Sequence, residues 1–310
     1  MEPQNGVKFV FFSGKGGVGK TTMAATTALW LAEKGHKTLI LSTDLQKSLS
    51  DILEQETVGK ETQVIGVPNL RAMTVETSES LARHQDKMMK TIEVVDPNSP
   101  LVKQYREGLQ SPGDCGCGKA AYYEFIDYLN KEEEYDVIVF DTAPTGQTLE
   151  QVRSPIDYVQ MLMGQIESRK RLTAVLGQKA VEQQIKELEA MKQQEENAIE
   201  NLRLNKTSFN MVMIPEAMPL AELERNIPVL ENDYKIPIRG IVINEVIPEK
   251  ERSVDDFWRN RWAMQKKYIG IARRKFPDKA IAEVPLLETE ALGVERIRKI
   301  ASSLYGGEKT

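Results

Sequence analysis

A phosphate-binding loop is indicated by eight consecutive residues near the amino terminus, Gly14-Lys15-Gly16-Gly17-Val18-Gly19-Lys20-Thr21. Glycines with this spacing let backbone N–H groups turn toward phosphate oxygens, and the first turn of a following helix adds positive partial charge. We expect Lys20 to reach the β- and γ-phosphates of a nucleotide and the hydroxyl of Thr21 to bind Mg²⁺. Thr22, which opens that helix, belongs to the same nucleotide-binding set. The alternative is a glycine-rich turn that binds no ligand.

Lys15 is the unusual residue of this loop, because it precedes Lys20 by only five positions. A second lysine here is too crowded to serve only its own loop. Its charge is therefore predicted to reach phosphates held by a second copy of the chain, as an arginine finger does in trans. This deviant form of the loop predicts catalysis by a dimer. The alternative is a solvated loop lysine.

Three further polar residues each follow a candidate strand. Side chains at the carboxyl ends of parallel strands face the ligand crevice. Asp44 is expected to orient or deprotonate the attacking water, and Asp141 to bind Mg²⁺ directly or through water. Asn244 has the donor and acceptor that pair with N7 and N6 of adenine. Pro144 and Gly146 mark a mobile switch that senses the γ-phosphate. At each position the alternative is a helix cap or turn residue.

Seven short β-rich runs alternate with helical stretches, the first of which covers residues 22–34. The runs are residues 7–12, 38–42, 70–75, 136–140, 209–214, 238–243 and 280–284. Several are apolar throughout, as strands buried on both faces should be. The alternation predicts an α/β fold with a mostly parallel sheet, the architecture of a P-loop NTPase.

Two segments break this alternation, residues 78–130 and residues 151–206. The second is rich in Gln, Glu and Lys and carries a narrow apolar stripe at helical spacing, from Val181 to Met191. We interpret both as insertions that form one helical subdomain packed over the sheet. Residues 1–77, 131–150 and 207–310 would then form the ATPase core.

Composition excludes several other classes of protein. The chain has 310 residues, a net charge of -5 and 41% hydrophobic residues, which is ordinary for a globular protein and gives no sign of the basic face that binds nucleic acid. The first six residues lack an apolar signal core, and the apolar runs are only strand-sized. We therefore expect a cytoplasmic protein that associates with a membrane only through a partner.

The two cysteines, Cys115 and Cys117, are too close together to act as an ordinary structural disulfide. Thiolates favour thiophilic centres, and the flanking glycines let the loop wrap closely. One pair supplies two thiolates, and a dimer would supply four. A soft metal or metalloid is the favoured ligand, with Zn²⁺ held by four thiolates as a variant. The alternatives are a redox switch or a surface loop without a role.

Taken in order, these motifs resemble those of the family that includes arsenical pump-driving ATPases and tail-anchored-protein targeting ATPases. The resemblance covers most of the chain: residues 14–22, 42–44, 48–51, 140–148, 214–216 (Ile-Pro-Glu), 244, 261–268 (Arg-Trp-Ala-Met-Gln-Lys-Lys-Tyr) and 284–286 (Val-Pro-Leu).

The family resemblance implies a homodimer or pseudodimer that closes around two ATP molecules. It implies that Lys15 acts across the interface, Asp44 acts on the water and Thr21 acts on Mg²⁺. It also implies that Asn244 contacts adenine, and it places Pro285 beside the nucleotide.

Three features distinguish this chain from the family pattern, and the first and third choose between its branches. Targeting ATPases carry a Cys-x-x-Cys zinc clasp before the Arg-Trp motif, where this chain has residues 255–258, Asp-Asp-Phe-Trp. Gln147 replaces the histidine that both branches use to relay substrate state. Cys115 and Cys117 lie in a segment that resembles the metalloid-binding region of the arsenical branch.

These features favour an ATPase that is stimulated by arsenite or antimonite and energises a membrane arsenite efflux pump. The alternative is a targeting factor whose partners are tail-anchored client proteins and a membrane receptor. Such a factor must cover an apolar helix of about 20 residues, which calls for a wide groove rich in Met or Leu. We expect the short run Met161-Leu162-Met163 to lie in the core instead. Iron–sulfur carriers and the nitrogenase iron protein resemble this chain mainly in the phosphate-binding loop.

Overall fold

The structure is a computed structural model that describes residues 6–44, 46–76, 117–131, 133–176, 178–203 and 205–305. The chain divides into two compact units. The first comprises Met1–Thr74, Lys131–Leu149 and Leu202–Thr310, and the second comprises Val75–Asn130 and Glu150–Asn201.

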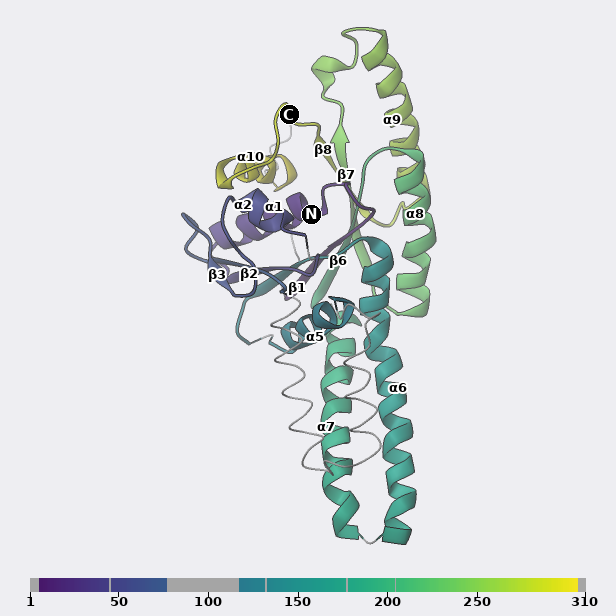
Figure 1. Cartoon of the computed structure of the whole chain (residues 1–310). Coiled ribbons are helices and arrows are strands. Elements are labelled where there is room, and N and C mark those ends of the chain that lie inside the picture. Colours follow the sequence, from purple (N-terminus) through teal and green to yellow (C-terminus); the bar gives the residue numbers. More distant parts are fainter. Residues whose placement is uncertain are drawn as a thin grey trace. The chain divides into compact units, whose positions relative to one another are not determined.

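An eight-stranded sheet lies at the centre of the first unit (Figure 1). Its order is β3-β4-β2-β5-β1-β6-β7-β8, and every neighbouring pair is parallel except β3 with β4. The strands are β1 Phe9–Ser13, β2 Thr38–Ser42, β3 Thr62–Gln63, β4 Leu70–Thr74, β5 Val137–Asp141, β6 Thr207–Met213, β7 Ile238–Val246 and β8 Ala280–Pro285. The predicted α/β fold with a mostly parallel sheet is confirmed.

Helices follow the strands of this unit (Figure 1). They are α1 Lys20–Glu33, α2 Ser48–Leu53, α8 Ala217–Pro228, α9 Asp256–Lys275 and α10 Val294–Tyr305, with a π-helical turn η1 Val229–Asp233 and a 3-10 turn η2 Glu249–Glu251. Strand β3 was not predicted from the sequence, because two residues carry no periodicity.

The central strands are held by apolar packing on both faces. Every residue of β1, β2 and β5 is buried. The ring of Phe11 stacks on Phe140 at 4.5 Å and on Phe209 at 5.2 Å between ring centroids. Each such pair contributes about 0.5–1.5 kcal/mol beyond the area that it buries. This packing fixes the carboxyl ends of β1, β2 and β5 at one edge of the sheet.

The described residues of the second unit form the helices α5 Cys117–Leu129, α6 Thr145–Leu176 and α7 Gln178–Arg203. The first residues of α6 belong to the first unit. Side chains join α6 to α7: Arg169 Nε donates to Gln184 Oε1 at 2.8 Å, and Lys170 pairs with Glu189 at 3.3 Å. None of the described helices has both the length and the apolar composition needed to cross a bilayer.

The expectation that the methionine run lies in the core is wrong for both methionines. Met161 and Met163 are 47% and 51% exposed, whereas Leu162 is buried. A helix turns about 100° per residue, so a narrow buried stripe keeps one residue inside and turns its two neighbours outward. Two methionines on α6 are therefore available to a partner.

A buried polar contact joins α5 to α7. The Tyr122 hydroxyl donates to Glu195 Oε2 at 2.7 Å. Burial, and to a smaller extent the charge of Asp127, raises the pKa of Glu195 from 4.5 to about 7, although the Tyr122 hydrogen bond opposes that shift. The folded protein therefore holds a proton on Glu195 that the unfolded chain releases at lower pH.

We expect stability to fall as pH rises from about 4.5 to about 7, because the folded state binds this proton more tightly than the unfolded state. Glu195→Gln should remove that decline and raise the free energy of unfolding at pH 8 by up to about 3 kcal/mol, with little change at pH 4.5. Urea unfolding at both pH values measures the effect. Glu189→Gln, at an exposed position of the same helix, is the control. Equal behaviour of the two variants would contradict the assignment.

Candidate functional site

The predicted phosphate-binding loop connects β1 to α1. Gly14 passes so close to β6 that an added Cβ would lie 2.2 Å from the carbonyl oxygen of Val212. Gly19 has a φ of 91° and precedes α1 without a side-chain cap. Because no side chain caps α1, the N–H groups of its first turn are available to an anion. The loop therefore has the backbone that phosphate binding requires.

Lys20 supplies a buried ammonium at the start of α1. It is 6% exposed, and among the described residues its Nζ makes one long hydrogen bond, 3.4 Å, to the carbonyl oxygen of Lys15. Burial lowers its pKa, and the charges of Asp141, Asp44 and Glu222 act in the opposite direction. An ammonium with so little hydrogen bonding is suited to a strongly anionic ligand such as a triphosphate.

Asp141 ends β5 and is fully buried. Its Oδ2 accepts a hydrogen bond from the Ser42 hydroxyl at 2.8 Å, whereas its Oδ1 has no hydrogen-bond partner among the described residues. Burial raises the pKa of Asp141 to about 6, against the hydroxyls of Ser42 and Thr21 and the charge of Lys20. A buried carboxylate oxygen without a partner fits Mg²⁺, which prefers oxygen ligands.

Asp44 lies between β2 and α2 and is half-buried. Its Oδ1 accepts from the backbone N–H of Gln46 at 3.2 Å. Its charge acts on both Lys20 and Asp141, so the structure brings these three predicted residues together. Lys15 is exposed on the same loop, and its side chain makes no hydrogen bond or ion pair within the described part of the chain.

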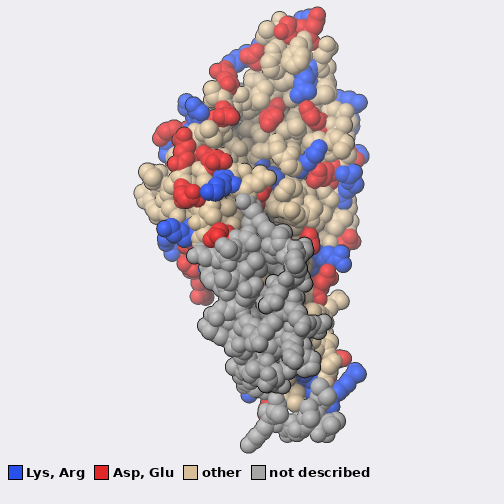
Figure 2. Space-filling model, in the orientation of Figure 1, with Lys and Arg blue, Asp and Glu red and all other residues tan. Residues whose placement is uncertain are grey.

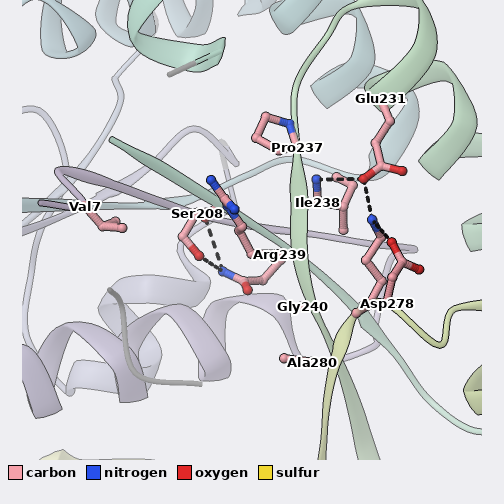
Figure 3. A pocket seen from close by; sticks show the side chains of 11 residues that line it. Val7, Ser208, Glu231, Pro237, Ile238, Arg239, Gly240, Asp278 and Ala280 are labelled. Atoms are coloured by element: carbon pink, nitrogen blue, oxygen red, sulfur yellow. Dashed lines mark hydrogen bonds and ion pairs between the residues drawn. The ribbon is translucent and has the colours of Figure 1, made fainter. Parts of the chain in front are cut away.

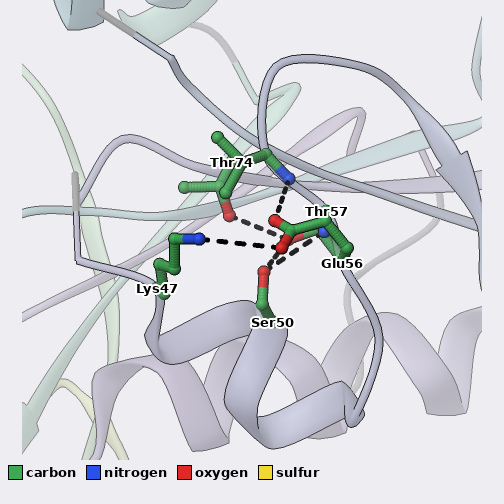
Figure 4. A network of polar contacts seen from close by, with 6 residues as sticks. Lys47, Ser50, Glu56, Thr57 and Thr74 are labelled. Carbon is green, nitrogen blue, oxygen red and sulfur yellow. Dashed lines mark hydrogen bonds and ion pairs between the residues drawn. The ribbon is translucent and has the colours of Figure 1, made fainter.

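A buried hydroxyl network anchors α2, the helix that follows Asp44 (Figure 4). Thr57 lies at its centre: its Oγ1 is 2.9 Å from Ser50 Oγ and 2.9 Å from Thr74 Oγ1. The Lys47–Glu56 ion pair beside it, at 3.7 Å, is exposed on both sides and contributes little. The network ties α2 to the end of β4. It therefore fixes the helix that follows the segment carrying Asp44.

The predicted base-binding residues lie at the ends of β7 and β8. Asn244 is buried, and its Nδ2 donates to the carbonyl oxygen of Val18 at 3.1 Å. Pro285 pairs with Val246 in the β7–β8 register, and Leu286 N donates to Val246 O at 2.8 Å. Asn244 therefore contacts the phosphate-binding loop, and Pro285 lies two strand positions away.

The structure describes some of the remaining predicted site residues but not all of them. Cys115 lies outside the described residues, and Cys117 is the first residue of α5. Gly146 is in the first turn of α6 rather than in a loop, because that helix begins at Thr145 directly after Pro144. Asp255, the first of residues 255–258, is a helix cap: its Oδ1 accepts from Trp258 N at 2.9 Å at the start of α9.

The sequence did not identify several residues that hold the site. Ser42 binds Asp141 across 99 positions of sequence, and Gln265 binds the segment after Asn244. The Thr145 hydroxyl is buried without a hydrogen-bond partner among the described residues. A serine or threonine at a strand end carries no local signal for such roles.

A pocket of about 460 Å³ lies at the opposite edge of the sheet, where β6, β7 and β8 begin (Figure 3). None of the predicted residues lines it. Its ammonium, Lys279, already pairs with Glu231 at 2.5 Å and with Asp278 at 2.8 Å, so we assign it no part in phosphate binding. On the face drawn in Figure 2, acidic and basic side chains of the described residues are interspersed, without a continuous basic stripe.

Comparisons with known proteins show the family of this chain. A family model described as anion-transporting ATPase matches residues 7–306. A protein of Halobacterium salinarum named "Putative arsenical pump-driving ATPase" is 32% identical over 100% of this chain and 46% of its own length, so the chain spans about half of that relative. "Putative arsenical pump-driving ATPase 2" of Aquifex aeolicus is 31% identical over 96% of this chain and 99% of the relative. "ATPase GET3" of Komagataella phaffii is 30% identical over 96% and 90%.

Proposed function

The chain belongs to the anion-transporting ATPase family, and on that premise we propose that it hydrolyses ATP as a homodimer that arsenite or antimonite stimulates. The metalloid would bind at Cys115 and Cys117. The ATPase would act in the cytoplasm and energise a membrane arsenite efflux pump.

Each residue of the nucleotide site has a role in this proposal. Lys20 and the N–H groups of the loop bind the phosphates, Asn244 binds adenine, and Asp44 orients the attacking water. The residues that would hold Mg²⁺ are Thr21 and Asp141. Mg²⁺ would neutralise charge on the β- and γ-phosphates when bound.

Metalloid binding would act on hydrolysis through the dimer. Thiolates from two chains that share one ligand would favour the closed dimer. Closure would bring Lys15 of each chain onto the phosphates of the other and so raise turnover. By linkage, nucleotide binding would tighten metalloid binding to the same extent.

The observation that carries this proposal is the placement of the thiols. The whole sequence has two cysteines, Cys115 and Cys117. At the position where targeting ATPases of the family hold zinc, this chain has a carboxylate that caps α9. Thiolate ligands are therefore confined to the segment that resembles the metalloid site of the arsenical branch.

Arsenite should raise the steady-state ATPase rate of the wild-type protein under reducing conditions. The double variant Cys115→Ser, Cys117→Ser should keep the basal rate and lose the stimulation, because a hydroxyl is a poor ligand for As(III). Phosphate release with and without arsenite measures both effects. Full stimulation of the double variant would refute the assignment.

A targeting factor for tail-anchored membrane proteins is the second candidate, and two observations favour it. Met161 and Met163 are exposed on α6, and relatives of similar identity are named ATPase GET3. Co-expression with a tail-anchored client decides between the functions. A stable complex, together with an ATPase rate that arsenite does not change, would replace the arsenical proposal.

A further inference from the structure

The end of β7 departs from regular strand geometry at the residue that faces the phosphate-binding loop. The register with β8 shifts between Ile243 and Val246, so Asn244 and Glu245 form a bulge. Glu245 has a φ of 57°, in the left-handed region that a non-glycine residue adopts only at a cost of about 1–2 kcal/mol. Bulges redirect side chains, and this one accompanies the turn of Asn244 toward Val18. Contacts from other side chains must therefore hold this strained backbone in place.

Gln265 of α9 provides the first anchor. Its side chain is 4% exposed. Oε1 accepts from the backbone N–H of Ile247 at 2.9 Å, and Nε2 donates to the carbonyl oxygen of Glu245 at 2.9 Å. One carboxamide therefore binds the backbone on both sides of Val246. Loss of either hydrogen bond of the Gln265 carboxamide would leave a buried backbone group without its partner.

Trp262 provides the second anchor, one helical turn before Gln265 on the same side of α9. The guanidinium of Arg252 lies 3.8 Å from the centre of the Trp262 ring, and its Nε donates to the carbonyl oxygen of Ile247 at 3.1 Å. The cation–π contact orients Arg252, and Arg252 holds the end of the bulged segment. Gln265 directly, and Trp262 through Arg252, thus hold residues 245–247.

We propose that Gln265 is a positioning residue for base selection, with Trp262 supporting it through Arg252. By fixing the bulge, Gln265 sets the direction of the Asn244 carboxamide. An Asn244 Oδ1 that faces the base accepts a hydrogen bond from the N6 amino group of adenine. The same oxygen repels O6 of guanine, because both atoms are hydrogen-bond acceptors. The inference rests on the proposed function in one respect, namely that Asn244 contacts the base.

Gln265→Met keeps the length of the side chain and removes both hydrogen bonds. Equilibrium binding of fluorescent ATP and GTP analogues should show the ATP Kd rising about tenfold and the GTP Kd changing less than about twofold. Competition by inorganic tripolyphosphate, which has no base, should be unchanged. Trp262→Leu should shift the same ratio in the same direction. Lys266→Met, at an exposed position of the same helix, should leave all three ligands unaffected.

The outcomes separate this inference from the proposed function. A wild-type protein that binds no nucleotide would overturn both. If the wild-type protein prefers ATP and a folded Gln265→Met variant keeps that preference, the positioning role is refuted while the ATPase assignment stands. An equal loss of affinity for ATP, GTP and tripolyphosphate would also refute it, since that pattern indicates a damaged phosphate loop. If Gln265→Met does not fold, an unchanged ATP preference in Trp262→Leu refutes the inference.

Discussion

Lys15→Ala should lower the ATP turnover rate by about a thousandfold or more, the scale of losing a cation supplied in trans to the transferred phosphate. The affinity for ATP should change little. Lys20, which is buried at the start of α1, remains to bind the phosphates, and the Lys15 side chain makes no hydrogen bond or ion pair within the described residues that its removal would break. Nucleotide binding and single-turnover hydrolysis, measured on the same preparation, separate the two effects.

Mixing two inactive chains tests whether Lys15 acts across a dimer. A Lys15→Ala chain retains its own Lys20, and a Lys20→Ala chain can supply Lys15. Their mixed dimer should regain one working site, whereas either variant alone should remain inactive. Lys60→Ala, at an exposed position far along the sequence from the loop, is the matched control for removing a surface charge. Full activity of a verified monomer would end the trans interpretation.

The local part of the site could be predicted because its signals are contiguous in sequence. The loop between β1 and α1 is specified within eight residues, and Asp141 directly ends an apolar run. The same contiguity explains the confirmed sheet, since each strand buried on both faces is a continuous apolar run. Strand β3 has two residues and could not be recognised in this way.

The supporting part of the site could not be predicted because it depends on contacts between distant residues. Ser42 and Asp141 meet only because β2 and β5 are neighbours in the sheet. Gln265 reaches the bulge only through the packing of α9, and periodicity within α9 does not distinguish it from an ordinary core residue. Met161 and Met163 were placed wrongly because a short apolar run does not show which of its residues the buried stripe will include.

Asp44→Asn should lower turnover at least about 100-fold while leaving the KM for ATP within about twofold, because a positioned catalytic carboxylate would be lost. Asparagine keeps the oxygen that accepts from Gln46 N, so the loop should retain its shape. The substitution also removes a negative charge that repels the buried Asp141 and attracts the buried Lys20, so its two effects on stability oppose each other. The free energy of unfolding should therefore change little, which distinguishes a lost catalytic group from a damaged fold.

Glu56→Gln is the matched control for this variant, because it removes an exposed carboxylate from the far end of the same segment. The hydroxyl network of Ser50, Thr57 and Thr74 does not use the Glu56 carboxylate, so α2 should stay anchored and turnover should stay near the wild-type rate. A slow Asp44→Asn variant beside a normal Glu56→Gln variant would place the effect at the attacking water. Near-normal turnover of Asp44→Asn would instead exclude Asp44 from the mechanism, and the water would have to be oriented by another group at the ends of β2 and β5.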